Sequence, residues 1–183
     1  FLNNIDGESQ TIQYQRSLTV LAGQNGLEII FVIDPLNGLD RRQFAPLPPQ
    51  LAGGNFSTPG VRTAFKNYAL RLAREFHPRY LMLASEINTY ADAHPDDFPN
   101  FVSLYHETYG AIKAESPDTQ VFVTFQWDDL NNAIPFDPTG GELYQTKWEQ
   151  IEIFEPNLDV WAISSYPFVA FDSSADIPPD YYT

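Results

Sequence analysis

Four mostly apolar stretches alternate along the chain with segments whose apolar residues recur at helical spacing. The stretches begin near Leu27, Tyr80, Val121 and Asp159. Their apolar continuity predicts strands that are buried on both faces, as in a parallel sheet covered by helices. Because a loop and then one helix separate each pair of strands, the βαβαβαβ order predicts an α/β fold with right-handed crossovers and a parallel sheet.

The clearest helical pattern follows Thr58, a capping residue type, and Pro59, which suits the first turn of a helix. Apolar residues then recur on one face as far as Phe76. Three further helices are predicted, over Thr11–Ala22, Phe101–Ile112 and Leu143–Phe154. The segments between these elements are polar or rich in Pro and Gly and are predicted to be loops, at 37–60, 92–99, 131–141 and from 171 onward.

Length and composition favour one compact domain. The chain has 183 residues, of which 43% are hydrophobic and 15% aromatic, enough to form a sizeable core. Four strands are too few for a closed eight-stranded barrel, which takes about 250 residues. The pattern therefore predicts either a small open α/β sheet or part of a barrel. Because the chain starts with Phe1 and not with Met, we expect it to be a processed or excised part of a longer protein.

The charge balance narrows the set of partners. Ten Lys and Arg against 24 Asp and Glu give a net charge of -14, which disfavours nucleic acids and anionic membrane surfaces. A neutral sugar would feel little net force from this charge. No apolar run approaches the roughly 20 residues of a membrane span. The absence of Cys excludes disulfides and thiolate chemistry but leaves the localisation unknown.

Polar and aromatic residues follow the predicted strands at the ends where ligands bind in parallel α/β folds. In the segment YLMLASEINTY (residues 80–90), the apolar run ends in Glu86, and Asn88 follows two residues later. If the strands share one orientation, six residues gather at one rim: Asp34, Glu86, Asn88, Trp127, Asp128 and Tyr166. Two carboxylates beside a bound acetal are what glycosidic bond cleavage needs, and aromatic rings suit the apolar faces of pyranoses.

Four of these candidates also have an interpretation without chemistry. Glu86 could cap a loop or pair with an Arg at the rim of the sheet. Asp34, which precedes Pro35, is of a type that often forms turns or caps helices. Trp127 could belong to the core, and Asp128 could simply begin a loop.

Cofactor and metal signals are weak in this sequence. His77, His94 and His106 show no metal-binding spacing, so we expect no metal. There is no Walker loop, GxGxxG turn or GxSxG elbow, so neither nucleotide binding nor serine hydrolysis is indicated, and we expect no cofactor.

Two segments resemble a known group of enzymes. LMLASEINTY resembles the fourth barrel strand of clan A glycoside hydrolases, nearest to the endo-β-1,4-galactanase family, and AISSYP resembles the sixth strand of that clan. The resemblance implies a TIM-barrel-like fold of parallel (β/α) units. On this alignment, residues 1–183 form a single partial (β/α)₈ domain that covers strands three to six and lacks the first two and last two.

The resemblance also implies a function. It makes Glu86 the general acid/base of a retaining glycosidase, with the other rim residues around a carbohydrate substrate. Ser85 stands where the clan usually has Asn, and the nucleophile of the clan, a Glu on strand seven, would lie outside this chain. The remainder of the barrel would come from the full-length chain or another copy, and a secreted or extracytoplasmic location is favoured. The alternatives are a catalytically silent carbohydrate-binding domain and a structural α/β domain without a ligand.

Overall fold

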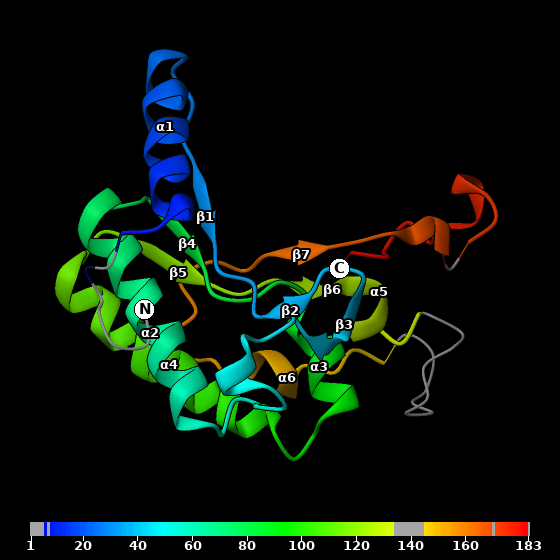
Figure 1. The fold of residues 1–183 in the computed structure, drawn as a ribbon. Coiled ribbons are helices and arrows are strands. Elements are labelled where there is room, and N and C mark those ends of the chain that lie inside the picture. The colour runs from blue at the N-terminus through cyan, green and yellow to red at the C-terminus, as the bar shows by residue number, and fades with distance from the viewer. Residues whose placement is uncertain (1–5, 7, 134–144, 170, 183) are drawn as a thin grey trace.

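The computed structural model describes residue 6 and residues 8–133, 145–169 and 171–182 (Figure 1). Its main sheet is parallel, and its strands follow chain order: β1 (Ile30–Val32), β4 (Tyr80–Met82) and β5 (Gln120–Phe122). A further parallel pair joins β6 (Phe125–Gln126) to β7 (Ile163–Ser164). Backbone hydrogen bonds continue from the main sheet to this pair. They run from Thr124 N to Ala84 O (3.1 Å) and from Phe125 N to Ala162 O (3.1 Å). The predicted parallel α/β arrangement is confirmed, and no closed barrel is present in the described residues.

Two long helices cover one face of this sheet (Figure 1). They are α2 (Pro59–Phe76) and α4 (Phe98–Glu115), both at the predicted places. Phe31 of β1 packs its ring against Phe76 of α2 with centroids 4.9 Å apart. Tyr105 of α4 donates its hydroxyl hydrogen to the carbonyl oxygen of Val121 at 3.3 Å. These contacts place the core between the sheet and the two helices.

The prediction of strands buried on both faces holds for β5, where the successive residues Val121 and Phe122 are both buried, but it is wrong for β1, whose face away from the helices is open. Within β1, Phe31 is buried, whereas Ile30 is 57% and Val32 43% exposed. Side chains alternate across a strand, so both exposed residues lie on the face away from the helices. The described part of the chain provides no layer for that face at β1, which is why apolar residues remain in contact with solvent there.

The predicted long loop at 37–60 contains regular structure. The antiparallel strands β2 (Leu36–Asn37) and β3 (Asp40–Phe44) form a hairpin, followed by the 3-10 helix η1 (Pro49–Leu51). The hairpin was not predicted because β3 is mostly polar. Its one apolar residue, Phe44, packs its ring 4.5 Å from that of Phe56.

Two strands end earlier than predicted. Helix α3 (Ile87–Ala93) starts directly after Glu86, and the short helix α5 (Trp127–Leu130) starts directly after β6. Asn88, Trp127 and Asp128 therefore lie on helices and not at strand ends. In α5 the turn is favoured locally, because the side chain of Gln126 accepts a hydrogen bond from the Asp129 N–H.

The remaining elements lie at the two ends of the chain. Helix α1 (Gln10–Gln24) matches its prediction. The predicted helix over 143–154 is reduced to α6 (Glu149–Glu152), and its residues 143 and 144 lie outside the described part. The C-terminal segment contains the 3-10 helices η2 (Pro167–Val169) and η3 (Ser174–Asp176). Among the described residues, no helix is both long and apolar enough to cross a membrane.

Asp159 joins α4 to the strands. Its carboxylate accepts hydrogen bonds from the hydroxyl of Tyr109 (2.9 Å) and the N–H of Val121 (2.8 Å), and Lys113 Nζ lies 2.7 Å away. Burial alone would raise the pKa of Asp159, but the hydrogen bonds and the Lys113 charge outweigh burial and hold this pKa below its usual value. Burial, followed by the hydrogen bond to Asp159, raises the pKa of Tyr109 to about 12.

We predict that Asp159→Asn destabilises the protein by about 2 kcal/mol at pH 7, since hydrogen bonds to a charged group are lost. A carboxyl whose pKa is lowered by folding stabilises the native state above its unfolded pKa, here the ordinary 3.8, and this contribution disappears as the pH falls through the folded pKa. Urea unfolding of both proteins at pH 7 and near pH 3 measures the difference. An equal gap at both pH values would contradict this assignment.

Candidate active site

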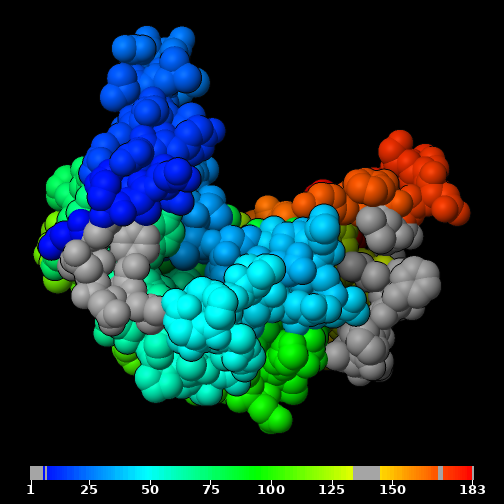
Figure 2. Space-filling model, in the orientation of Figure 1, coloured from blue at the N-terminus to red at the C-terminus, as the bar shows by residue number. Residues whose placement is uncertain are grey.

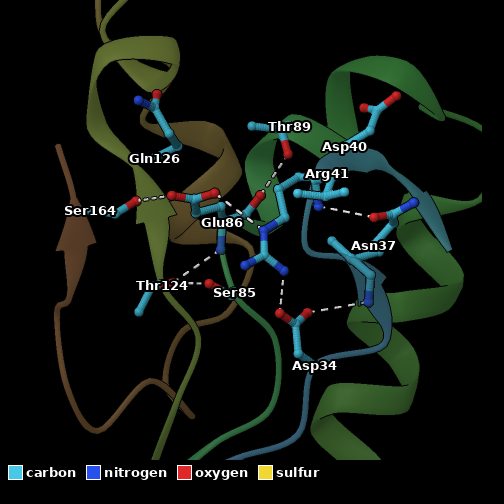
Figure 3. Close-up of polar contacts among 12 residues, drawn as sticks. Asp34, Asn37, Asp40, Arg41, Ser85, Glu86, Thr89, Thr124, Gln126 and Ser164 are labelled. Carbon is cyan, nitrogen blue, oxygen red and sulfur yellow. Dashed lines mark hydrogen bonds and ion pairs between the residues drawn. The ribbon is translucent and has the colours of Figure 1, made fainter. Parts of the chain in front are cut away.

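Glu86 occupies an unusual backbone conformation in the connection between β4 and α3. Its φ of 53° and ψ of 45° are left-handed, which is uncommon for a residue other than Gly. The Glu86 N–H donates to Thr124 Oγ1 at 3.0 Å, and the hydroxyl of Thr89 donates to the Glu86 carbonyl oxygen at 2.8 Å (Figure 3). Such conformations cost of order 1–3 kcal/mol and cluster at functional sites. The backbone of Glu86 is thus held in a strained turn that aims its side chain.

The Glu86 carboxylate is mostly buried and holds specific partners. Its side chain is 12% exposed. The hydroxyl of Ser164, on β7, donates to Oε1, and Arg41 Nε lies 3.3 Å from Oε2 (Figure 3). Strands β4 and β7 and the hairpin therefore converge on one carboxyl group.

Arg41, from β3, connects two of the predicted carboxylates. Its guanidinium points between Asp34 and Glu86 and donates to Asp34 Oδ2 (Figure 3). Asp34 Oδ1 also accepts from the Leu36 N–H at 3.2 Å, the turn-forming contact considered for an Asp before Pro. The sequence did not identify Arg41, although a rim Arg beside Glu86 was one of its alternatives. The hairpin that delivers Arg41 was the missing information.

Asn88 is fully buried near Glu86, and its side-chain amide hydrogen-bonds to the backbone of β6. Its Nδ2 donates to the Gln126 carbonyl at 3.0 Å, while its Oδ1 accepts from the Gln126 N–H at 2.8 Å. The side-chain amide thus pairs with the β6 backbone as a neighbouring strand would. This arrangement fixes α3 against the strand and leaves the amide facing away from solvent.

Asp128 and Trp127 are also buried. Asp128 accepts hydrogen bonds from Gln126 Nε2 (2.8 Å), Ser165 Oγ (3.3 Å), the Tyr166 N–H (2.6 Å) and the hydroxyl of Tyr181. The Trp127 indole donates to the Tyr181 carbonyl at 2.8 Å. The structure therefore uses both side chains to hold the C-terminal segment and the loop after β7.

Tyr166 is the exposed aromatic residue at this rim. Its ring lies next to that of Phe168, with centroids 6.1 Å apart, and both rings are exposed. The negative charge of Glu86, followed by burial and a hydrogen bond to Glu86, raises the pKa of the Tyr166 hydroxyl. Tyr166 thus lies between the exposed ring of Phe168 and the mostly buried carboxylate of Glu86.

Replacing Glu86 by Gln is expected to lower the pKa of Tyr166, because it removes the anion that opposes ionisation of the phenol. Titration of ¹³Cζ-labelled tyrosines by NMR measures this pKa, and Tyr166→Phe identifies the signal. An unchanged Tyr166 pKa in Glu86→Gln would contradict the contact.

The predicted residues fall into two groups. Asp34, Glu86 and Tyr166 surround Arg41 at the open rim, whereas Asn88, Trp127 and Asp128 lie in the buried layer beside it. The described residues include no cluster of three or more His, Asp or Glu side chains placed to hold a metal ion.

Comparison with known proteins adds no relative to this picture. The sequence matches no protein-family model, and searches of curated proteins and of solved structures gave no significant match.

Proposed function

We propose that this chain is part of a retaining glycoside hydrolase with a TIM-barrel-like framework. Glu86 acts as the general acid/base that protonates the glycosidic oxygen, and the nucleophile comes from a carboxylate outside residues 1–183. The substrate is a polysaccharide or an oligosaccharide. The parallel strands in chain order, with their two main helices on one face, support the barrel framework.

The observation that carries the proposal is the position of Glu86. It lies in the short connection between the carboxyl end of the parallel strand β4 and helix α3, in a strained left-handed conformation, next to the exposed ring of Tyr166. Carboxyl ends of parallel strands are where such folds bind ligands. A carboxyl group held beside an exposed pair of rings suits a sugar whose apolar face stacks on the aromatics while its glycosidic oxygen approaches the acid.

Arg41 and Ser164 give Glu86 a defined orientation. A general acid must lie within hydrogen-bond reach of the oxygen that it protonates, and fixed neighbours hold it there. Retaining hydrolysis also needs a second carboxyl group about 5 to 5.5 Å from the first. Asp34 shares Arg41 with Glu86 and would line the sugar site.

A catalytically silent carbohydrate-binding domain is the second candidate. One observation favours this candidate: both oxygens of the Glu86 carboxylate already have partners, Ser164 at Oε1 and Arg41 at Oε2. A sugar could then bind at Tyr166 and Phe168 without reaction.

Two assays of the purified protein, and of the full-length gene product, distinguish these candidates. Reducing-end release from a panel of β-glycans reports hydrolysis, and titration calorimetry with the same saccharides reports binding. Hydrolysis supports the enzyme, and binding without hydrolysis supports the silent domain. If no glycan binds or is cleaved, both proposals fail.

A further inference from the structure

Two carboxyl groups share the guanidinium of Arg41. Asp34 directly precedes the β2–β3 hairpin, Arg41 lies on β3, and Glu86 lies between β4 and α3. Arg41 donates from Nη1 to Asp34 Oδ2 and places Nε 3.3 Å from Glu86 Oε2 (Figure 3). One positive charge therefore stands between two acids that come from different parts of the chain.

The three side chains are largely shielded from solvent, as the space-filling view of the body around the hairpin also suggests by its close packing (Figure 2). Their exposed fractions are 25% for Asp34, 22% for Arg41 and 12% for Glu86. Charges in such surroundings interact more strongly than charges in water, and salt screens them less. The charge of Asp34 therefore influences the proton on Glu86 through their common partner.

Asp34 is fixed in place by the backbone of the hairpin. Its Oδ1 accepts a hydrogen bond from the Leu36 N–H at 3.2 Å, which leaves Oδ2 directed at the guanidinium. Asp34 thus acts on Glu86 through Arg41, as a positioning residue.

The other groups that face Glu86 are hydroxyls. Ser164, on β7, donates to Oε1, and the Tyr166 hydroxyl interacts with the same carboxylate. The charge of Glu86 is the main cause that raises the pKa of Tyr166, with a smaller effect from Asp128, so this phenol is neutral near pH 7. In the described part of the chain, Arg41 is the cation that pairs with Glu86.

A general acid must hold its proton until the glycosidic oxygen takes it. A guanidinium without a second counter-ion would favour the carboxylate of Glu86, because an opposite charge favours the ionised form of an acid. The charge of Asp34 offsets this effect. In the second half of a retaining reaction the Glu86 carboxylate takes a proton from the attacking water, and Arg41 stabilises the anion until then.

We propose that Asp34 sets the balance between the acid and the carboxylate of Glu86 by neutralising Arg41. The catalytic meaning of this balance rests on the proposed function, whereas the coupling between the two carboxyl groups is measurable without substrate.

Asp34→Asn separates the charge from the shape, because Asn can still accept the hydrogen bond from the Leu36 N–H. In an NMR titration of ¹³Cδ-labelled glutamates, with Glu86→Gln to identify the signal, the midpoint for Glu86 should fall by about one pH unit. Asp40→Asn is the matched control. Asp40 forms the same kind of ion pair on this hairpin, but with Arg42 (2.8 Å), so its removal should leave the midpoint unchanged.

A double variant shows whether Arg41 transmits the effect. Once Arg41→Gln has removed the guanidinium, adding Asp34→Asn should no longer lower the Glu86 midpoint. A fall of the same size with and without Arg41 would overturn the proposal, and so would an unchanged midpoint in Asp34→Asn alone. Circular dichroism confirms that each variant folds.

The pH dependence of turnover extends the test to catalysis. In the full-length protein, the alkaline limb of kcat should move to lower pH in Asp34→Asn by the same amount as the NMR midpoint. A limb that stays in place while the midpoint moves would contradict the catalytic part of the inference. If the midpoint moves but the unaltered protein cleaves no glycan, the proposed function fails and the coupling of Asp34 to Glu86 stands.

Discussion

In the full-length protein, Glu86→Gln is expected to lower the turnover of an ordinary glycan by about 10²- to 10⁴-fold, the contribution typical of a positioned general acid. Gln has the shape of Glu and can still accept the hydrogen bond from Ser164, so the site should keep its form. The amide of Gln, however, cannot deliver a proton to the leaving oxygen. Initial rates of reducing-end release at saturating substrate measure the loss.

The matched control is Glu152→Gln, which makes the same chemical change at an exposed position on α6. It should leave turnover unchanged. Circular dichroism of both variants confirms that they fold. Equal turnover by Glu86→Gln and the unaltered protein would remove Glu86 from the mechanism.

Asp128→Ala should give the largest loss of stability, about 3 to 5 kcal/mol. The Asp128 carboxylate is fully buried and accepts four hydrogen bonds, and each buried donor left without an acceptor costs about 1–3 kcal/mol. Two of these donors, the Tyr166 N–H and the Tyr181 hydroxyl, tie the rim and the C-terminal segment to α5. We therefore expect hydrogen exchange to accelerate around both residues.

Urea unfolding measures the stability change, and Asp172→Ala, at an exposed position, is the control and should change the stability by less than about 0.5 kcal/mol. If the two variants unfold at the same urea concentration, Asp128 is not the structural connection described here.

The alternation of strands and helices could be predicted because each element carries its own periodic signal. The apolar stripe that begins after Pro59 defines α2, and the apolar run that begins at Tyr80 defines the strand before Glu86. The placement of Glu86 at the rim followed from these local patterns and from the parallel topology.

Other features depend on contacts between distant residues. Trp127 is buried because Tyr181, 54 residues later, folds back onto it. Arg41 reaches Glu86 through a hairpin whose strand β3 is too polar to show alternation. The local sequence holds no signal for either contact.

The site also shows why a residue type does not fix a role. Asp34 and Asp128 both follow predicted strands, yet Asp34 is partly exposed and pairs with Arg41, whereas Asp128 is enclosed by hydrogen-bond donors. Burial decides between these roles, and burial here is set by tertiary packing.

The most direct test of Glu86 as the acid compares leaving groups. Rates of the full-length protein and its Glu86→Gln variant are measured on aryl glycosides from dinitrophenyl, which departs without a proton, to alkyl, which does not. We expect the variant to lose little activity on the dinitrophenyl glycoside and most of it on the alkyl glycoside. A loss of the same size on both substrates would contradict proton donation by Glu86.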